Sequence, residues 1–391
     1  MMRNDVLDLA RRVAMRLREN GYQSWLVGGC VRDLLLNREP KDCDVSTSAH
    51  PDQIQAMFPG ALPVGAHFGV MLVKAGQAQI EVATFRSDGQ YSDGRRPDQV
   101  VFESDVKQDL LRRDFSINAL LMDPATDEIH DFVGGRDDLE ARLIRAIGDP
   151  RERFREDHLR MMRAVRFAAR FGFEIEAGTW EAICAGKQSI TRISAERITG
   201  ELARILTEGG AARGMTMLRD CGLLEVILPG AGPLDILSRL RSPGFELALA
   251  SVLLDDNRGM NRLRLSNEVC ARVLALIANH SRFGRVHEMT LSERKRFLRM
   301  KDFDRHLELY RAAVSADARY EYARRLRESM TDEMLWPRRL LTGDDLKQLG
   351  IPPGPRYAKI LTELEDAQLE GRIGTRVEAE AFVEQIAGSG G

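Results

Sequence analysis

Apolar residues at the start of the chain follow first helical and then strand spacing. They recur at every third or fourth position over residues 4–20, where Gly21 can end the helix. A strand, SWLV, comes next and leads through a Gly28-Gly29 turn into a short helix over residues 31–36. This alternation predicts a mixed α/β region.

The same mixture continues to about residue 139. DCDVS has the pattern of a second strand, and Pro51 marks the start of a helix that reaches about residue 58. FGVMLVKAGQAQIEVATFR predicts a β-hairpin that turns around Gly76, and the polar residues 86–99 predict a long loop. We interpret residues 1–139 as one mixed α/β domain.

After residue 139 strand patterns nearly vanish, and helical spacing dominates to about residue 385. RERFREDHLRMMRAVRFAARFGF, which begins at Arg151, predicts one amphipathic helix rich in arginine. Further helices are expected at about residues 194–207, 212–221, 246–254 and 265–279, with basic helical regions at 292–311 and 320–327. The second part of the chain is therefore predicted to be all-α.

Composition places the chain among soluble, multidomain globular proteins. It has 391 residues, 43% of them hydrophobic and 30% charged, and no apolar run approaches the ~20 residues of a membrane helix. The charged, helical N-terminus does not resemble a signal peptide. Five cysteines without a CxxC pair argue against a disulfide framework or a cysteine zinc site, and fit the cytoplasm. The net charge of −2 means that a nucleic-acid binder of this type would need local basic patches.

Three carboxylates are the first candidates for chemistry. Asp42 and Asp44 are one residue apart in the predicted strand, so their side chains are expected on one face. Glu81 lies in the neighbouring hairpin. Such carboxylates repel one another unless water screens them or a cation lies between them, and oxygen ligands of this kind suit Mg²⁺. A DxD motif alone is common on protein surfaces, so this pattern by itself is weak.

A glycine turn lies just upstream of the carboxylates. Gly28 and Gly29 allow backbone N–H groups at the start of a helix to approach phosphate oxygens, and Arg32 lies one turn into that helix. The turn is neither a P-loop nor a GxGxxG motif. Together with the carboxylates, it points to two-metal phosphoryl or nucleotidyl transfer to or from a triphosphate.

The combined motifs resemble the class II tRNA nucleotidyltransferases, or CCA-adding enzymes, and their bacterial poly(A) polymerase relatives. The resemblance is continuous over about residues 22–210 and weaker beyond. The motifs are LVGGCVRD, KDCDVST, IEVATFR, DGQYSDGRRP, LLRRDFSINAL, DFVGGRDDL and EDHLRMMRAVRFAARFGF. Two departures are small: Cys43 stands where an apolar residue is usual, and Ser116 replaces a common threonine.

The resemblance implies an α/β nucleotidyltransferase head with a mixed sheet, followed by all-α neck, body and tail domains. The expected boundaries are 1–139 for the head, 140–207 for the neck, 208–280 for the body and 281–391 for the tail. It also implies that Asp42 and Asp44 bind two Mg²⁺ ions and that Glu81 supports catalysis. The 3′-hydroxyl of the RNA would then attack the α-phosphate of an incoming nucleotide.

RRDFSINAL is expected to contact the nucleotide. By resemblance, Arg113 and Asp114 hold the triphosphate and the ribose, and Asn118 belongs to the same motif. An arginine can fork onto phosphates, and an aspartate can accept a hydrogen bond from a ribose hydroxyl. The alternative, which is compatible with this role, is that Asp114 caps a helix.

Asp157, Arg160, Arg163 and Arg166 repeat every three residues, so they are expected near one helix face. The alternative is an exposed stripe of salt bridges. By resemblance, Asp157 and Arg160 read the incoming base, while Arg163 and Arg166 assist base and phosphate placement.

The base-reading role agrees with hydrogen-bond chemistry. A carboxylate only accepts hydrogen bonds and a guanidinium only donates them. Cytosine and adenine both present an amino donor beside a ring-nitrogen acceptor, whereas uracil and guanine present a carbonyl beside an N–H. One acid–arginine pair would therefore select C and A without a nucleic-acid template.

The polar loop matches a flexible loop that the family needs for adding the final A, and that enzymes adding only CC lack or shorten. Its residues are Asp88, Gly89, Tyr91, Asp93, Arg95, Arg96 and Pro97. The match favours complete CCA addition, with an ordinary surface loop as the alternative.

The expected partners are the tRNA 3′ end, CTP and ATP, without a membrane, in a monomer or weak homodimer. The basic C-terminal helices would contact tRNA phosphates. The alternatives are a poly(A) polymerase, an A-adding enzyme, or a noncatalytic RNA-binding protein, which would have no need for three repelling acids. His130-Asp131 is the only His-Asp dipeptide and has no histidines nearby at ligand spacing, which argues against an HD phosphohydrolase.

Overall fold

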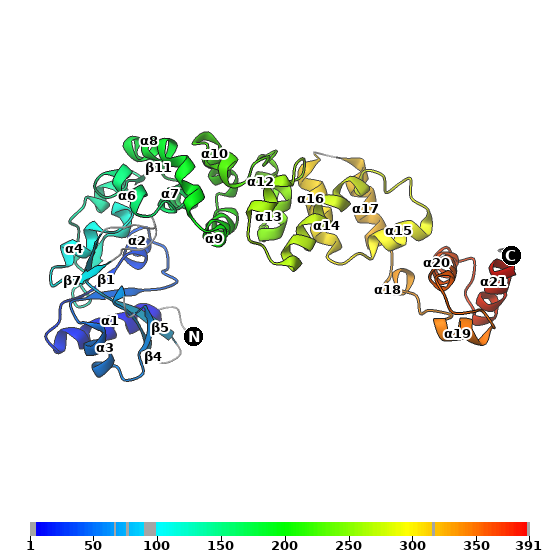
Figure 1. The fold of residues 1–391 in the computed structure, drawn as a ribbon, viewed down its shortest axis with the longest axis horizontal. Helices are drawn as coiled ribbons and strands as arrows, with labels where there is room; N and C mark the ends of the chain where they lie inside the picture. Colours follow the sequence, from blue (N-terminus) through cyan, green and yellow to red (C-terminus); the bar gives the residue numbers. More distant parts are fainter. Residues whose placement is uncertain (1–4, 66–67, 76–77, 90–98, 315–316, 389–391) are drawn as a thin grey trace. The chain divides into compact units, whose positions relative to one another are not determined.

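The computed structural model describes residues 5–65, 68–75, 78–89, 99–314 and 317–388. The chain divides into two compact units: residues 1–231 with 256–265, and residues 232–255 with 266–391. The first unit begins with a sheet and continues in helices, and the described part of the second is helical (Figure 1). The predicted fold class is confirmed.

A seven-stranded sheet with the order β3-β4-β5-β2-β1-β8-β9 forms the N-terminal part. Its strands are β1 (Ser24–Val27), β2 (Asp44–Thr47), β3 (Leu62–Gly65), β4 (Val70–Ala75), β5 (Ala78–Thr84), β8 (Leu121–Met122) and β9 (Ile129–His130). β2 pairs with β5 in parallel, and the other pairs described in this sheet are antiparallel. The predicted hairpin is thus β4–β5.

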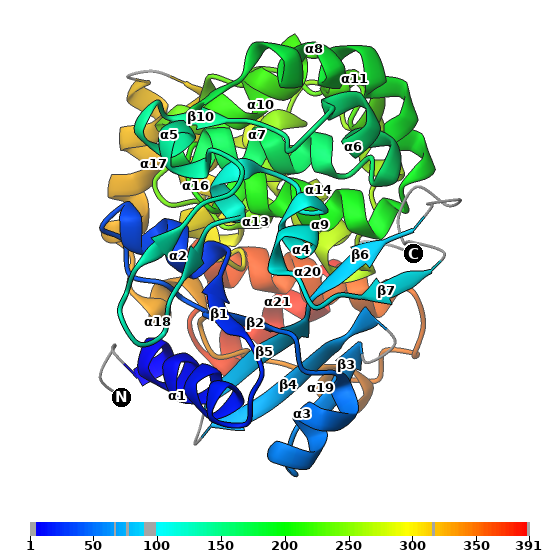
Figure 2. The same cartoon turned by 90° about the vertical axis from the view of Figure 1, so that its left-hand side faces the viewer.

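Each face of the sheet is covered differently. α1 (Asp5–Glu19) packs against β1, β2 and β5 on one face, as Figure 2 shows. Three of the apolar residues in this helix, Ala10, Val13 and Leu17, are at most 4% exposed. On the other face Val27 joins a buried cluster with Leu110 of α4 (Val106–Leu111). Asp44 is in register with Val27, so its side chain belongs to the face toward α4.

Three details of the head differ from the prediction. α2 (Gly29–Leu35) begins at the second glycine instead of at residue 31. Asp42 precedes β2, so strand alternation does not place it beside Asp44. β6 (Arg86–Asp88) and β7 (Val100–Phe102) pair as a two-stranded arm, although residues 86–88 were expected to belong to a loop. Residues 86–88 are polar, and they form a strand only because their backbone groups bond a partner strand on the far side of the loop. α3 (Pro51–Met57) begins at the predicted proline.

The predicted arginine-rich helix is two helices, α6 (Pro150–Glu156) and α7 (Arg160–Phe171). Asp157 interrupts it with extended backbone angles (φ −145°, ψ 104°), and its carboxylate accepts a hydrogen bond from the Leu159 N–H at 3.1 Å. A short polar side chain that bonds its own backbone in this way competes with helix formation. The prediction of one continuous helix was wrong for this reason.

Short elements complete the first unit around these two helices. They are η2 (Ser116–Asn118), α5 (Gly135–Glu140), β10 (Leu143–Ile144), β11 (Glu174–Ile175), α8 (Ala177–Gly186), η3 (Lys187–Arg192), α9 (Ala195–Thr207), α10 (Ala211–Asp220), α11 (Leu223–Ile227) and η4 (Arg258–Arg262). β10 and β11 pair in parallel across α6 and α7. The domain boundaries at 139, 207 and 280 stay predictions.

The second unit is built from helices around two apolar clusters. Its helices are α12 (Ile236–Arg239), α13 (Phe245–Val252), α14 (Asn267–Phe283), α15 (Leu291–Leu298), α16 (Phe303–Ala313), α17 (Ala318–Glu328), α18 (Asp332–Leu335), α19 (Gly343–Gln348), α20 (Arg356–Leu369) and α21 (Arg376–Gly388). One cluster contains Phe283 and Leu335, and the other contains Leu341 and Leu364. The basic region predicted as a helix over 292–311 breaks before α16, where Asp302 has a left-handed backbone (φ 57°).

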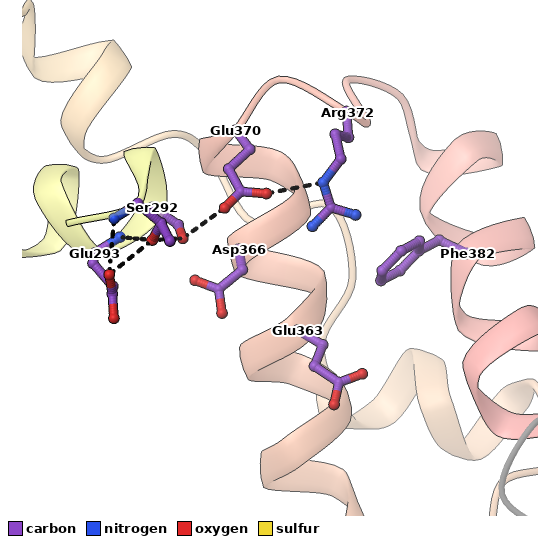
Figure 3. Close-up of a pocket in the computed structure, with 8 residues that line it drawn as sticks. Ser292, Glu293, Glu363, Asp366, Glu370, Arg372 and Phe382 are labelled. Carbon is purple, nitrogen blue, oxygen red and sulfur yellow. Dashed lines mark hydrogen bonds and ion pairs between the residues drawn. The ribbon is translucent and has the colours of Figure 1, made fainter. Parts of the chain in front are cut away.

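A hollow of about 500 Å³ lies among α15, α20 and α21 (Figure 3). Its lining includes Ser292, Glu370, Arg372 and Phe382. Glu370 accepts hydrogen bonds from Ser292 and Arg372, each at 2.9 Å, so this carboxylate ties α15 to the end of α20. The contact is structural, because the charged group already has partners within the protein.

Across the described residues, no helix combines the length and the apolar character that crossing a membrane requires.

Candidate active site

The structure brings Asp44 close to the other two carboxylates of the predicted trio. Val45 of β2 is paired with Val82 of β5, so Asp44 lies beside Glu81 on adjacent parallel strands. Burial, followed by the negative charges of Glu81 and Asp42, raises the pKa of Asp44 to about 7. The described residues contain no group of three His, Cys, Asp or Glu side chains arranged to hold a metal ion. The negative charges of Glu81 and Asp42 thus disfavour the ionised form of Asp44.

Cys43 separates the two aspartates and is only 3% exposed, as expected for an inward-facing residue. Asp42 and Glu81, in contrast, are exposed. The chain at this point sends one small side chain into the core and its acidic neighbours outward. Asp42 and Asp44 are therefore both more accessible than the residue between them.

The glycine turn is shaped by a close approach. Gly28 has a left-handed backbone (φ 78°), and a Cβ there would come within 3.3 Å of Arg113 Nη1 and 3.6 Å of the Asn118 carbonyl oxygen. Its N–H donates to the Leu120 carbonyl at 3.2 Å. Gly28 thus lets α2 begin against the RRDFSINAL segment, and its N–H is already used within the protein.

A chain of polar contacts links α2 to α7 through this segment. The Arg32 guanidinium is buried and donates to Asn118 Oδ1 at 2.5 Å, and Asn118 Nδ2 donates to Asp114 at 3.0 Å. Asp114 also accepts two hydrogen bonds from Arg163, at 2.6 and 2.9 Å. Four predicted nucleotide-binding residues are therefore brought together, although their polar groups already bond one another. Asp114 also accepts from the Phe115 N–H at 2.8 Å, but it does not cap η2, whose N-cap is Phe115.

We expect Asp114 to make folding stability depend on acid pH. Burial alone would raise its pKa, but Arg163 and Asn118 outweigh that effect and hold the pKa at about 2, below the ordinary 3.8. A depressed pKa contributes stability above pH 3.8 that is lost as the pH falls toward 2, on the order of 2 kcal/mol. Urea unfolding at pH 5 and pH 3 should show a smaller loss for Asp114→Asn than for the wild type. Equal losses would contradict the assignment.

Asp109 was missed by the sequence analysis. This fully buried carboxylate accepts from Arg112 at 2.6 Å, from Arg113 at 3.1 Å and from the Ser46 hydroxyl at 3.3 Å. It holds Arg113 near Asp44, and Arg113 is the positive group that lowers the pKa of Asp44. An acid three and four residues before two adjacent arginines was the available signal.

The four residues of the predicted helix face go to four different places. Asp157 accepts from Arg197 of α9 at 2.8 Å, and Arg160 donates to Glu156 at 2.6 Å and to the Arg112 carbonyl at 3.1 Å. Arg163 bonds Asp114, as described above. Arg166 is 3% exposed and pairs with Glu201 and Glu208. Two of these partners, Arg197 and Glu156, were not predicted. Glu156 lies four residues before Arg160, a spacing that could have indicated the pair, whereas Arg197 lies on a helix 40 residues after Asp157.

Arg166 is bound inside the helices, so its predicted role toward the nucleotide finds no support in this geometry. The alternative of an exposed salt-bridged stripe is also wrong for this residue. Its Nε lies 2.5 Å from Glu201, and its guanidinium lies 4.2 Å from the centre of the Phe167 ring. The pair joins α7 to α9.

Replacing Arg166 with methionine should lower the free energy of unfolding by about 3–5 kcal/mol, because it leaves the buried Glu201 without its partner. The matched control is Arg204→Met, which removes a 53% exposed arginine paired with Glu208 and should change stability by about 0.5 kcal/mol or less. Denaturant unfolding measures both. A loss below about 1 kcal/mol for Arg166→Met would refute the structural role.

The loop residues are only partly within the described chain. Asp88 ends β6 and lies 3.0 Å from Arg86 and 4.0 Å from Arg112, and the Gly89 N–H donates to the Gln99 carbonyl at 2.8 Å. Tyr91, Asp93, Arg95, Arg96 and Pro97 lie outside the described residues. Arg112 therefore contacts both the base of the arm and, through its carbonyl, Arg160.

Comparison with known proteins gives the same assignment for most of the chain. The family described as "Poly A polymerase head domain" matches residues 24–145, and that described as "Probable RNA and SrmB- binding site of polymerase A" matches residues 172–233. The CCA-adding enzyme of Geobacillus sp. (strain WCH70) is 33% identical over 389 residues, with 92% of each chain covered. The chain belongs to the CCA-adding enzyme family. The family, the fold class and the enzyme class predicted from the sequence are confirmed.

Other CCA-adding enzymes match over different extents. That of Geobacillus thermodenitrificans (strain NG80-2) is 44% identical over 218 residues, which is 56% of this chain and about half, 54%, of that relative's length. A crystal structure of the Bacillus stearothermophilus CCA-adding enzyme in complex with CTP superposes with a TM-score of 0.83 at 29% identity, covering 100% of this chain and 98% of that one. The similarity to CCA-adding enzymes is therefore strongest in sequence over part of the chain and extends in fold over all of it.

Proposed function

We propose that this CCA-adding enzyme completes the 3′ end of tRNA, adding C, C and A from CTP and ATP without a template and releasing pyrophosphate. The observation that carries the proposal is the family membership over 92% of the chain, together with the repelling carboxylates beside Arg113. A protein that only bound RNA would gain nothing from a partly buried acid whose charge its neighbours oppose.

The carboxylates fit a divalent cation. Burial and two neighbouring negative charges destabilise the ionised form of Asp44. A hard cation between Asp44 and Asp42 would instead stabilise it. We propose that these two aspartates hold Mg²⁺ and that Glu81 supports them. When bound, the ions would supply electrostatic stabilisation to the α-phosphate and activate the RNA 3′-hydroxyl. Only divalent-metal use in general follows from the family, and Mg²⁺ is our choice of ion.

The residues around the carboxylates have roles that follow from their contacts. Asp109 holds Arg113 at 3.1 Å, which directs a guanidinium toward the place where a triphosphate would lie beside Asp44. Gly28 provides the room for this arginine. Gly29 and Arg32 belong to the same turn. Asp114 could accept a hydrogen bond from a ribose hydroxyl, and Asn118 could donate one, in addition to the hydrogen bonds that they already make.

Base selection is proposed for Asp157 and Arg160. In the structure Asp157 faces Arg197, and Arg160 faces Glu156, so each side chain is held by an ion-pair partner. Asp157 would accept the amino group of cytosine or adenine, and Arg160 would donate to the ring nitrogen beside it. Uracil or guanine would place a carbonyl acceptor against the Asp157 carboxylate and an N–H donor against the Arg160 guanidinium.

The runner-up functions are a bacterial poly(A) polymerase and an enzyme that adds only A. One assay separates them: tRNA ending at the discriminator base, at C or at CC is offered each nucleotide singly and mixed, and the products are sequenced. We expect C, C and A in order, and then a stop. Homopolymeric A tails on unrelated RNA, or A added only to a CC end, would replace the proposal with the corresponding alternative.

We place the enzyme in the cytoplasm as a monomer or weak homodimer. The five cysteines are all unpaired in the structure, which suits a reducing compartment.

A further inference from the structure

The end of α18 and the residue that follows this helix present large apolar side chains to solvent. Met334 is 45% exposed and Trp336 is 49% exposed. The other two tryptophans of the chain, Trp25 and Trp180, are only partly accessible. The Arg327 guanidinium lies 5.9 Å from the centre of the Trp336 ring.

The backbone of this segment is anchored at both ends, so the exposure does not come from a loose loop. Leu335 is fully buried in one apolar cluster of the second unit, and Leu341 is 2% exposed in the other. The Leu335 carbonyl accepts from Arg299 at 3.3 Å, and the Arg338 carbonyl accepts from Gln368 at 2.7 Å. Trp336 is held on a fixed support between two cores.

Two arginines that follow Trp336 in the chain by two and three residues lack acidic partners. Arg338 and Arg339 are exposed, and neither has a carboxylate within 4.0 Å among the described residues. Arg324, in contrast, lies between Glu321 and Glu328, at 2.8 and 2.7 Å. The acids nearest in sequence, Asp332 and Glu333, are in the first turn of α18, and Asp332 lies 3.8 Å from Arg327.

We propose that this surface, the Trp336 platform, binds the RNA substrate. The platform consists of Arg327, Met334, Trp336, Arg338 and Arg339. An unpaired base stacks on the indole, and the two free guanidinium groups contact backbone phosphates. The proposal rests on the proposed function, because under that function the substrate that the second unit would meet is an RNA.

The chemistry favours RNA over another occupant. Every base has a π-face, so an exposed indole with an arginine near its ring binds single-stranded RNA without reading its sequence. Arginines without acidic partners can bind phosphates, and the release of counterions from the RNA then raises the affinity. A wholly apolar partner would remove water from Arg338 and Arg339 without offering them a hydrogen-bond acceptor or a negative charge, and this would weaken binding.

The test uses the full chain and measures the KM for tRNA ending in CC, with ATP saturating. Trp336→Ala should raise that KM about tenfold, with kcat and the KM for ATP unchanged, and Trp336→Phe should restore most of the loss. Arg338→Ala with Arg339→Ala should raise the KM and reduce its salt slope by about 1–2. Tryptophan fluorescence should be quenched by tRNA in the wild type and less so in Trp336→Phe.

Arg324→Ala is the matched control, because that arginine of α17 is partly exposed but already paired with two glutamates, and the KM of this variant for tRNA should stay near the wild-type value. If the wild type completes CCA while the platform variants keep the wild-type KM, the platform is refuted and the function stands. If Trp336→Ala changes the sedimentation mass instead of the KM, the surface joins two copies and the proposal is wrong. Should Trp336→Ala fail to fold, Trp336→Phe fluorescence and the double arginine variant decide.

If no nucleotide is added to any tRNA, the proposed function fails by itself. Direct filter binding of tRNA to the wild type and to the arginine variant still tests the platform in that case. Equal binding by the two proteins would overturn it.

Discussion

Asp44→Asn should reduce CTP incorporation by at least about 10³-fold, because it removes a ligand of the proposed metal ions and with it several kcal/mol of charge stabilisation. The same change should not lower folding stability without metal at pH 8. Asp44 has a pKa near 7 in the folded protein, above the ordinary 3.8, so its ionised form opposes folding once the pH exceeds the unfolded value. Single-turnover incorporation and thermal unfolding in EDTA measure the two effects.

Asp52→Asn is the matched control for this prediction. Asp52 is an exposed aspartate in the first turn of α3 in the same part of the chain, and it should leave incorporation near the wild-type rate. Loss of activity together with retained or higher stability is the signature expected of a functional carboxylate. Incorporation by Asp44→Asn at a rate within tenfold of the wild type would overturn the proposed metal site.

Asp157→Ala should reduce the preference for CTP over UTP, and for ATP over GTP, by about 10- to 100-fold in kcat/KM. The reason is that one contact of about 1–3 kcal/mol is lost for the correct bases and one clash is removed for the wrong ones. The measurement is kcat/KM for each nucleotide on tRNA primers of the matching length. An unchanged CTP:UTP ratio would show that Asp157 does not read the base.

Arg197→Ala provides a graded comparison at the same site. It leaves the carboxylate but removes its partner, whose Nη2 lies 2.8 Å from Asp157. We expect a smaller loss of discrimination than in Asp157→Ala, because Asp157 can still accept from the base but is less firmly placed. A larger loss than in Asp157→Ala would mean that Arg197 itself contacts the nucleotide.

Local pattern was enough to place most elements of the head. The apolar spacing of α1 and the hairpin β4–β5 each reflect neighbours within one short stretch, and the structure has both as predicted. The arginine-rich helix failed because a single side-chain bond from Asp157 to the Leu159 N–H competes with a periodic pattern that otherwise continues. The arm β6–β7 failed because its hydrogen bonds join strands on either side of the polar loop.

In the candidate site, too, the sequence predicted some features, and others depended on long-range contacts. The motifs identified the acidic and basic residues, but not what they touch. The contact of Asp109 with Ser46 required α4 to lie against β2, and the contact of Arg197 with Asp157 required α9 to lie against the break after α6. Arg166 looked equivalent to Arg163 by spacing, yet three residues of a helix rotate it away from Asp114 and toward Glu201.

By itself, the order of residues carried the motifs that resemble the family, the two kinds of secondary structure, and Asp42 and Asp44 shortly after a glycine turn. These are matters of motif and short-range spacing. Only the tertiary structure decided which charges meet. The pair Asp157–Arg197 joins residues 40 positions apart, and the burial that raises the pKa of Asp44 comes from strands and helices packed around it. Coulomb energy and desolvation depend on distance in space, which the spacing of residues along a chain does not contain.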